Sequence, residues 1–139
     1  MIIKYIKLTE DAKPFAYSRE GDACMDIFAN HDCIIYPNAI RTVKSGIAIE
    51  IPEGWEGIVR GRSGMACKGI FTHVGTIDSN YRGEVGVILH NLYPDEYIIR
   101  KGDRVAQFCL QPVTNLNLIL CEKLSETNRG EAGYGSSGK

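Results

Sequence analysis

The sequence predicts an all-β domain, either a sandwich or a barrel of short strands. Runs rich in β-branched residues recur along the chain, and Pro, Gly, Asn and Asp interrupt them at short intervals. The length of 139 residues fits one domain that buries a core without disulfides.

Three strands are predicted in the first half of the chain. Residues 2–8 alternate between apolar and polar side chains, and residues 41–51 are β-branched. The second run ends at a turn that Pro52 and Gly54 form, and residues 55–61 follow as the next strand.

The second half continues the strand pattern. Residues 83–92 place Val85, Val87 and Leu89 on one face, and residues 93–96 turn the chain. The last two predicted strands are residues 104–113 and 116–124. A single short helix is predicted at residues 63–70, and Ser63 is expected to cap it.

The C-terminal stretch, residues 125–139, has a different composition. It is rich in Gly and nearly free of aliphatic side chains, so it cannot bury enough surface to fold alone. The simplest interpretation is a disordered tail, although Arg129 and Tyr134 stand among its glycines.

Composition excludes several classes of protein. The net charge of −1 lacks the basic excess of a nonspecific nucleic-acid binder. Lys4 and Lys7 break the N-terminal apolar run, so we expect no signal peptide, and no apolar segment is long enough to span a membrane.

The five cysteines are odd in number and form no CxxC pair. A disulfide framework or a zinc site is therefore not expected. We interpret them as reduced thiols of a cytosolic protein, mostly small core residues.

Five short stretches have the charged, aromatic and hydroxyl side chains that suit a charged, partly aromatic ligand. In their order and separations they resemble the five motifs of the trimeric dUTP pyrophosphatases (dUTPases), and the resemblance covers nearly the whole chain. They are "DACMDIFA" (22–29), "GRSGMA" (61–66), "GTIDSNYRGE" (75–84), "KGDRVAQ" (101–107) and "NRGEAGYGSSGK" (128–139).

The resemblance implies a jelly roll or distorted β-barrel over residues 1–124 and a flexible tail, 125–139, that closes over the active site. It implies Mg²⁺-assisted hydrolysis of dUTP to dUMP and pyrophosphate, by in-line attack of water on the α-phosphorus. This reaction would limit uracil in DNA and supply dUMP for dTMP synthesis. A homotrimer with shared sites, a cytoplasmic or equivalent location, and no nucleic-acid or membrane partner are also implied.

The first motif contains two acids, Asp22 and Asp26, which would share one face of an alternating strand. Hard cations prefer such oxygen ligands, often through retained waters. The resemblance assigns Mg²⁺ binding through water to Asp26. Without it, the acids equally fit a strand edge protected from aggregation. Cys24 stands where the family usually has Gly.

The second motif places donors at the start of the predicted helix, an arrangement that suits phosphate. The resemblance assigns the polyphosphate to Arg62, Ser63 and Gly64, with Gly61 where the family usually has Pro. Taken alone, the motif also fits a capped surface helix with a solvated arginine.

The third motif is expected to form a hairpin whose unpaired backbone groups read a base edge. The resemblance implies that backbone groups near Gly75 and Ile77 bind uracil, with Thr72 or His73 near the place of the family's usual Asn. Tyr81 would lie under the deoxyribose and exclude a 2′-hydroxyl. Asp78 would accept hydrogen bonds from the 3′-hydroxyl and from water, as general base or orienter. An isolated Asx turn is the alternative.

The fourth and fifth motifs would complete the site. Arg104 is expected to pair with an acid of a neighbouring subunit, and Gln107 to reach the α-phosphate or the attacking water. In the tail, Arg129 would meet the terminal phosphates, and Tyr134 would stack on uracil where the family has Phe. Backbone and hydroxyl groups that would wrap the phosphates belong to Gly135, Ser136 and Ser137.

Three rival functions remain open at this point. A dCTP deaminase of the same superfamily would need a positioned glutamate, for which Glu84 is the candidate beside Asp78. A dUTP-sensing regulator would bind nucleotide and signal to a protein. A structural jelly-roll protein would leave the clustered Arg, Ser and Asp side chains unexplained.

Overall fold

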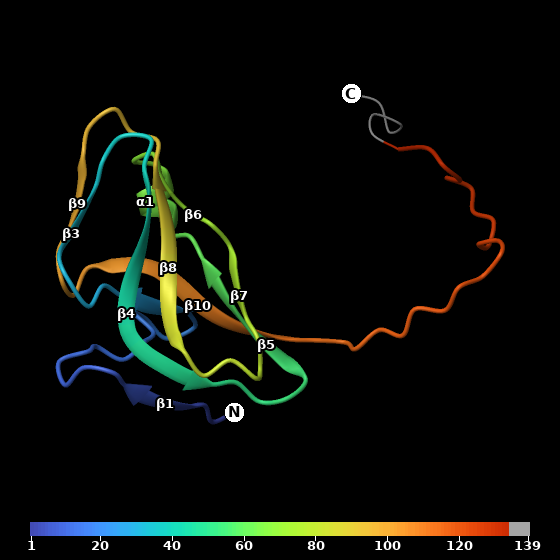
Figure 1. Ribbon diagram of the computed structural model, residues 1–139, viewed down its shortest axis with the longest axis horizontal. Coiled ribbons are helices and arrows are strands. Elements are labelled where there is room, and N and C mark those ends of the chain that lie inside the picture. The colour runs from blue at the N-terminus through green and yellow to red at the C-terminus, as the bar shows by residue number, and fades with distance from the viewer. Residues whose placement is uncertain (134–139) are drawn as a thin grey trace.

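Two four-stranded antiparallel sheets and one two-stranded sheet form the molecule (Figure 1). The computed structural model describes residues 1–133. The first sheet has the order β1-β4-β8-β6, the second β2-β10-β5-β7, and the third pairs β3 with β9. The elements are β1 (Lys4–Lys7), β2 (Met25–Phe28), β3 (Cys33–Ile35), β4 (Ile40–Glu50), β5 (Trp55–Arg60), α1 (Ser63–Ala66), β6 (Ile70–Thr72), β7 (Gly75–Ile77), β8 (Glu84–Asn91), β9 (Tyr97–Ile99) and β10 (Arg104–Pro112).

The all-β prediction is confirmed, because every strand pair is antiparallel and α1 is the single helix of residues 1–133. The core lies between the two larger sheets. Val85, Val87 and Leu89, predicted to share a face of β8, are all fully buried. From the other sheet, Phe108 of β10 and Val59 of β5 join the same apolar cluster.

Strand β4 bends sharply at Gly46, whose φ is +71°. The pairing of β4 with β8 shifts register between Lys44 and Ala48 at this place. The carbonyl of Gly46 accepts a hydrogen bond from Leu8 at 2.8 Å, and its N–H donates to Glu84 Oε1 at 2.7 Å. The bend lets one long strand pair with β8 and with β1.

The strand predicted over residues 116–124 is not formed. Strand β10 ends at Pro112, and residues 113–133 contain neither helix nor strand. This segment leaves the body of the molecule in Figure 1, with Leu118 96% and Leu120 100% exposed. A strand needs a sheet edge to pair with, and this segment points away from the edge strands of its own chain.

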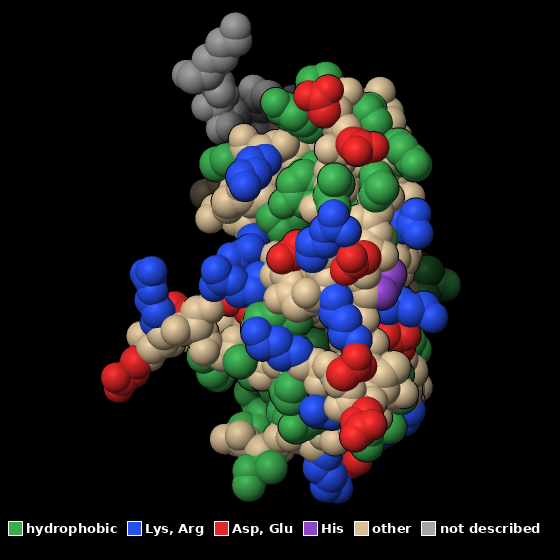
Figure 2. All heavy atoms as spheres, turned by 90° about the vertical axis from the view of Figure 1, so that its left-hand side faces the viewer, with side chains coloured by type: hydrophobic (Ala, Val, Ile, Leu, Met, Phe, Trp, Pro, Cys, Tyr) green, Lys and Arg blue, Asp and Glu red, His purple; other side chains and the backbone are tan. Residues whose placement is uncertain are grey.

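The face of the molecule in Figure 2 shows Lys and Arg side chains interspersed with Asp, Glu and hydrophobic side chains. Such a mixed surface agrees with the nearly balanced net charge of −1. In the part of the chain that the structure describes, no helix has the length and apolar character that crossing a membrane requires.

Candidate active site

Asp26 on β2 is the centre of a buried ionic cluster. Asp26 is 3% exposed, and its carboxylate lies 3.4 Å from Nε of Arg62 and 3.3 Å from Nη1 of Arg104. The hydroxyl of Ser18 donates a further hydrogen bond to it. We call Ser18, Asp26, Arg62 and Arg104 the Asp26 cluster.

The pKa of Asp26 is lowered from its ordinary value of 3.8. Burial by itself would raise this pKa, because it removes water from the charged carboxylate. The Ser18 hydrogen bond and the positive charges of Arg62 and Arg104 together outweigh burial. Asp26 is therefore an anion at neutral pH.

Both arginines of the cluster make further hydrogen bonds within it. Arg62 Nη1 donates to the backbone carbonyl of Arg104 at 2.9 Å, and Arg104 Nη1 donates to Ser18 Oγ at 3.0 Å. We expected Arg104 to pair with an acid of another subunit, but its acid partner is Asp26 of its own chain. Strand pairing of β10 with β2 places that acid within reach.

Gln107 lies opposite Asp26 on one neighbouring strand and opposite Arg60 on the other. Strand β10 is central in its sheet, so the position of Gln107 is fixed from both sides. Directly opposed residues of antiparallel strands project from the same face. The sheet thus brings the acid of the first motif and the amide of the fourth together.

The second motif begins the helix as predicted, but Ser63 does not cap it. The N-cap residue is Arg62, with no side-chain cap hydrogen bond, and Ser63 is the first helical residue. Because Ser63 is exposed, its hydroxyl is open to solvent. A side chain added at Gly64 would meet nothing within 4 Å, so there is room for a ligand beside this backbone.

The third motif is not a hairpin, which corrects our expectation. Strand β7 pairs with β5 in one sheet, whereas β8 pairs with β4 and β6 in the other. The residues between them cross from sheet to sheet. Since β7 is an edge strand, one side of the backbone from Gly75 to Ile77 has no strand partner within residues 1–133.

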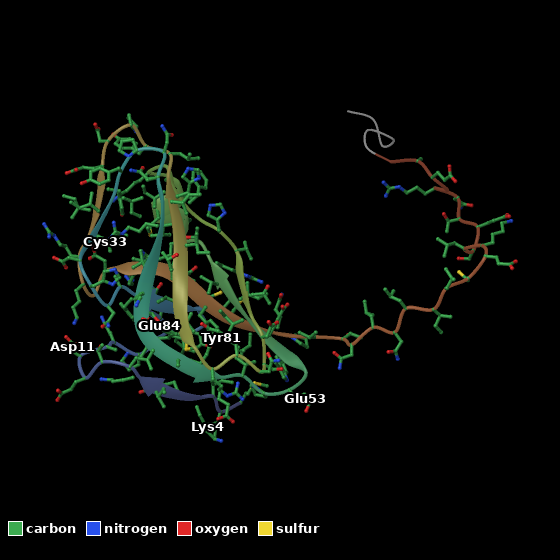
Figure 3. All side chains as sticks on the ribbon, in the orientation of Figure 1. Lys4, Asp11, Cys33, Glu53, Tyr81 and Glu84 are labelled. Atoms are coloured by element: carbon green, nitrogen blue, oxygen red, sulfur yellow. The ribbon has the colours of Figure 1, made fainter. Side chains whose placement is uncertain are left out.

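Asp78 and Tyr81 lie in the turn that follows β7. The N–H of Tyr81 donates to the Asp78 carbonyl at 3.0 Å, and its hydroxyl donates to the Glu84 carbonyl at 3.1 Å. Figure 3 shows Tyr81 close to Glu84 at this connection. Asp78 is exposed, and its carboxylate makes no hydrogen bond with any residue that the structure describes. Both side chains are accessible to a ligand.

Glu84, the deaminase candidate, is engaged elsewhere. Its carboxylate accepts the N–H of Gly46 at 2.7 Å and lies 3.9 Å from Nζ of Lys44. These contacts tie the side chain to the bend of β4. The structure therefore gives Glu84 a structural partner and does not favour the deaminase alternative.

One chain does not bring the Asp26 cluster and the Asp78 turn together. Between them, within residues 1–133, there is no hydrogen bond or ion pair. On β5, Gly57 faces Ile77 and Arg60 faces Gln107, so the two sites lie three residues apart along that strand. This is roughly 10 Å in the strand direction, with further strands between them.

The remaining predicted positions have different surroundings. Thr72 Oγ1 is buried and has no hydrogen-bond partner among the described residues, and it faces the Cα of Gly61. Arg129 is exposed on the segment that leaves the body, where its Nε donates to the Ala132 carbonyl at 3.0 Å. Outside the described residues lie Tyr134, Gly135, Ser136 and Ser137.

Asp22 does not share a strand face with Asp26. It lies before β2 in an exposed turn, where its carboxylate accepts the N–H of Arg19 at 2.8 Å. Ser18, in contrast, belongs to the Asp26 cluster although no sequence pattern pointed to it. A lone serine in a loop carries no pattern that would identify this role.

The residues around Asp26 do not form a complete cation site. Residues 1–133 contain no group of three or more His, Cys, Asp or Glu side chains able to hold a metal ion. Because the carboxylate is already paired with two guanidinium groups, a cation beside it would have to keep its waters and take other ligands from the substrate. Mg²⁺ does so, and it takes further ligands from substrate phosphates.

Comparison with known proteins identifies a family that this chain matches. A family model described as dUTPase matches residues 10–138. The deoxyuridine 5'-triphosphate nucleotidohydrolase of Clostridium tetani is 41% identical over 140 residues, which cover 99% of this chain and 97% of that protein.

Solved structures agree with the fold. A mutant of the Staphylococcus bacteriophage 80alpha dUTPase, solved with dUpNHpp, superimposes with a TM-score of 0.93 at 26% identity and covers 99% of both chains. A mutant dUTPase from phage phi11 of S. aureus, whose structure describes a structural Mg(II) ion, has a TM-score of 0.83 at 24% identity. That match covers 88% of this chain and 98% of the phage protein.

Proposed function

This chain belongs to the dUTPase family, and we propose that it hydrolyses dUTP to dUMP and pyrophosphate by attack of water on the α-phosphorus. The observation that carries the proposal is the Asp26 cluster. It fixes the guanidinium of Arg62, the N-cap residue of α1, on Asp26, which lies opposite Gln107 on the neighbouring strand.

Arg62, Ser63 and Gly64 bind the polyphosphate. The guanidinium offers several donors, the Ser63 hydroxyl is exposed, and the backbone at Gly64 is unobstructed. The ion pair with Asp26 orients Arg62, and this pre-organisation lowers the entropy cost of binding the polyphosphate. The terminal phosphates are held by Arg129 and by the tail residues Gly135, Ser136 and Ser137.

The open edge of β7 reads the base. Backbone groups at Gly75 and Ile77 have no strand neighbour on that side, so they can pair with the polar edge of uracil. Tyr81 packs under the deoxyribose and excludes a 2′-hydroxyl, and Tyr134 stacks on the base. Thr72 is a weaker candidate for a base contact, because its hydroxyl is buried against Gly61.

Asp78 accepts a proton from the attacking water or orients it, and Gln107 orients the α-phosphate or that water. The reaction needs no covalent nucleophile, since positioning and charge stabilisation are the usual means of phosphoryl-transfer catalysis. Bound Mg²⁺, held through water by Asp26, would neutralise charge on the triphosphate.

The distance between the Asp26 cluster and the Asp78 turn supports a homotrimer with shared sites. In that assembly the turn of one subunit meets the cluster of another, and the tail, 125–139, closes over the nucleotide. The strongly exposed apolar side chains of residues 113–124 support association, because monomers rarely expose such a stretch. The dUTPase-like domain of this proposal comprises residues 1–124, of which residues 113–124 extend from the body of the single chain.

The reaction would serve the cytoplasm or an equivalent compartment. There it would limit the incorporation of uracil into DNA and would supply dUMP for dTMP synthesis. Neither nucleic acid nor membrane is a partner in this proposal, in keeping with the net charge of −1.

Hydrolysis in ¹⁸O-labelled water tests the position of attack. Attack on the α-phosphorus places the label in dUMP and leaves pyrophosphate unlabelled. The control is the same reaction in ordinary water, with both products analysed by mass spectrometry. Label in pyrophosphate, or release of inorganic phosphate from dUTP by the intact enzyme, would contradict the proposed chemistry.

A further inference from the structure

Two half-buried cysteines lie across neighbouring strands next to the Asp26–Gln107 pair. Strand β10 pairs with β2 so that Gln107 faces Asp26 and Phe108 faces Met25. One step further in the same register, Cys109 faces Cys24, the residue directly before β2. Both thiols are partly exposed to solvent.

The backbone hydrogen bonds identify the type of this pair. Asp26 donates its N–H to the Ala16 carbonyl at 2.8 Å and accepts the Ala16 N–H at 3.3 Å, so its backbone groups point away from β10. Asp26 and Gln107 therefore form a non-hydrogen-bonded pair. Pair types alternate along an antiparallel ladder, which makes Cys24 and Cys109 a non-hydrogen-bonded pair as well.

That pair type suits a disulfide. Non-hydrogen-bonded partners have Cα atoms roughly 4.5 Å apart and side chains that approach closely. Disulfides accept Cα separations of about 4.4–6.8 Å. Burial raises the pKa of the Cys109 thiol, and the neighbouring Cys24 raises it further, so the two thiols interact.

We propose that Cys24 and Cys109 are a redox modification site, at which a peroxide links β2 to β10 through a reversible disulfide. Peroxide oxidises one thiol to a sulfenic acid and is itself reduced to water. The second sulfur attacks the sulfenic sulfur, the S–S bond forms, and the hydroxyl leaves as water with the second thiol's proton. Two thiols lose two electrons in total, and one peroxide accepts them.

The remaining cysteines provide contrasts. Cys33 is buried on β3 and has β9 as its partner strand, while Cys67 and Cys121 are exposed. The raised pKa of Cys109 keeps little of it as thiolate at neutral pH, so we expect the oxidation to be slow. The inference does not depend on the proposed hydrolysis of dUTP, since its products are identified chemically.

The test treats the full chain with hydrogen peroxide, blocks free thiols and maps the peptides. Cleavage before aspartates isolates Cys24 in residues 22–25, apart from Cys33. The Cys121→Ser variant leaves Cys109 as the single cysteine of the peptide that begins at Asp103. We expect a disulfide to join these two peptides and dithiothreitol to separate them. On a non-reducing gel the oxidised protein should still run as a monomer.

Cys24→Ser is the matched control for a second readout. Peroxide should raise the unfolding temperature of the Cys121→Ser protein by several degrees, because a cross-link between distant residues restricts the unfolded chain. This rise should be absent when Cys24→Ser is added. Recovery of Cys24 and Cys109 as free thiols, or as separate sulfinic acids, while Cys67 is oxidised would overturn the proposal.

Discussion

Asp26 anchors two arginines, and the proposed function adds the binding of a cation through water. Its carboxylate is almost fully buried, yet Arg62, Arg104 and Ser18 satisfy it. A buried carboxylate without such partners would be strongly destabilising. The same contacts that stabilise the charge therefore determine where the guanidinium of Arg62, the proposed phosphate ligand, lies.

Asp26→Asn should reduce the free energy of unfolding by about 3 kcal/mol, the lower end for breaking a buried ion pair, since both arginines remain partly hydrated. It should also weaken dUTP binding through the misplaced Arg62. Asp22→Asn is the control, because that exposed acid lies in the preceding turn, and it should cost less than about 1 kcal/mol. Urea unfolding measures both variants.

The lowered pKa of Asp26 predicts how stability depends on pH. A carboxylate whose pKa is lower in the folded than in the unfolded state stabilises the protein above its unfolded pKa, here about 3.8. That contribution is lost as pH falls from this value through the lower folded pKa. The wild type should therefore lose more stability than Asp26→Asn below pH 3.8. Parallel curves for the two proteins would show that Asp26 is not the group responsible.

Strand β4 and its bend connect the two ends of the first sheet. Gly46 has the positive φ that favours glycine, and a Cβ there would lie 2.6 Å from Asn30 Nδ2 and 2.8 Å from the Ala12 Cβ. Conformation and packing thus both require glycine. The bend also receives the Glu84 carboxylate, through which it supports the connection that carries Asp78 and Tyr81.

Gly46→Ala should destabilise the fold more than Gly54→Ala. Both glycines have positive φ, +71° and +78°, so each substitution costs about 1–2 kcal/mol in backbone strain. A Cβ at Gly54 meets nothing within 4 Å, whereas one at Gly46 overlaps Asn30 and Ala12. We expect about 1–3 kcal/mol of further loss at Gly46 in urea unfolding. Equal losses would mean that the bend has no packing requirement.

Local patterns predicted the elements better than their pairing. Alternation in residues 83–92 identified a buried face of β8, which the structure confirms with Val85, Val87 and Leu89. The same kind of pattern predicted a strand at 116–124 that one chain does not form. Sequence periodicity records that a segment has apolar faces, but not which edge or which molecule covers them.

The candidate site shows the same limit. The motif residues Asp26, Arg62 and Gln107 were selected from the sequence; strand pairing places Gln107 opposite Asp26, and an ion pair joins Arg62 to Asp26. Ser18 and the Asp26–Arg104 ion pair were not foreseen, because they depend on loop geometry and register. The third motif was expected to be a hairpin, since local turn residues do not reveal that β7 and β8 belong to different sheets.

The proposed shared site depends on assembly of the chain into an oligomer. Leu116, Leu118 and Leu120 alternate along an extended segment and are at least 80% exposed in the single chain. If the protein is a homotrimer, this segment has a neighbouring subunit to pack against. The same contact would carry the tail toward a site on another subunit.

Replacing Leu118 and Leu120 by Asn should therefore weaken the trimer. In sedimentation the wild type is expected at three times the chain mass of 15.4 kDa, and the double variant at lower mass. Asn117→Ser, directly before Leu118, is the matched control and should remain trimeric. A wild type that sediments as a monomer at micromolar concentration would remove the basis for shared sites.

The most direct test of the central claim is pyrophosphate release from dUTP, dCTP, UTP and dTTP with Mg²⁺, comparing the wild type with Asp78→Asn. We predict release from dUTP alone and a loss of at least about 100-fold in the variant, the usual minimum for a general base. Binding of dUTP without release would indicate a nucleotide sensor in place of an enzyme. Release from the other nucleotides at similar rates, or an unchanged rate in Asp78→Asn, would contradict the proposed specificity and the role of Asp78.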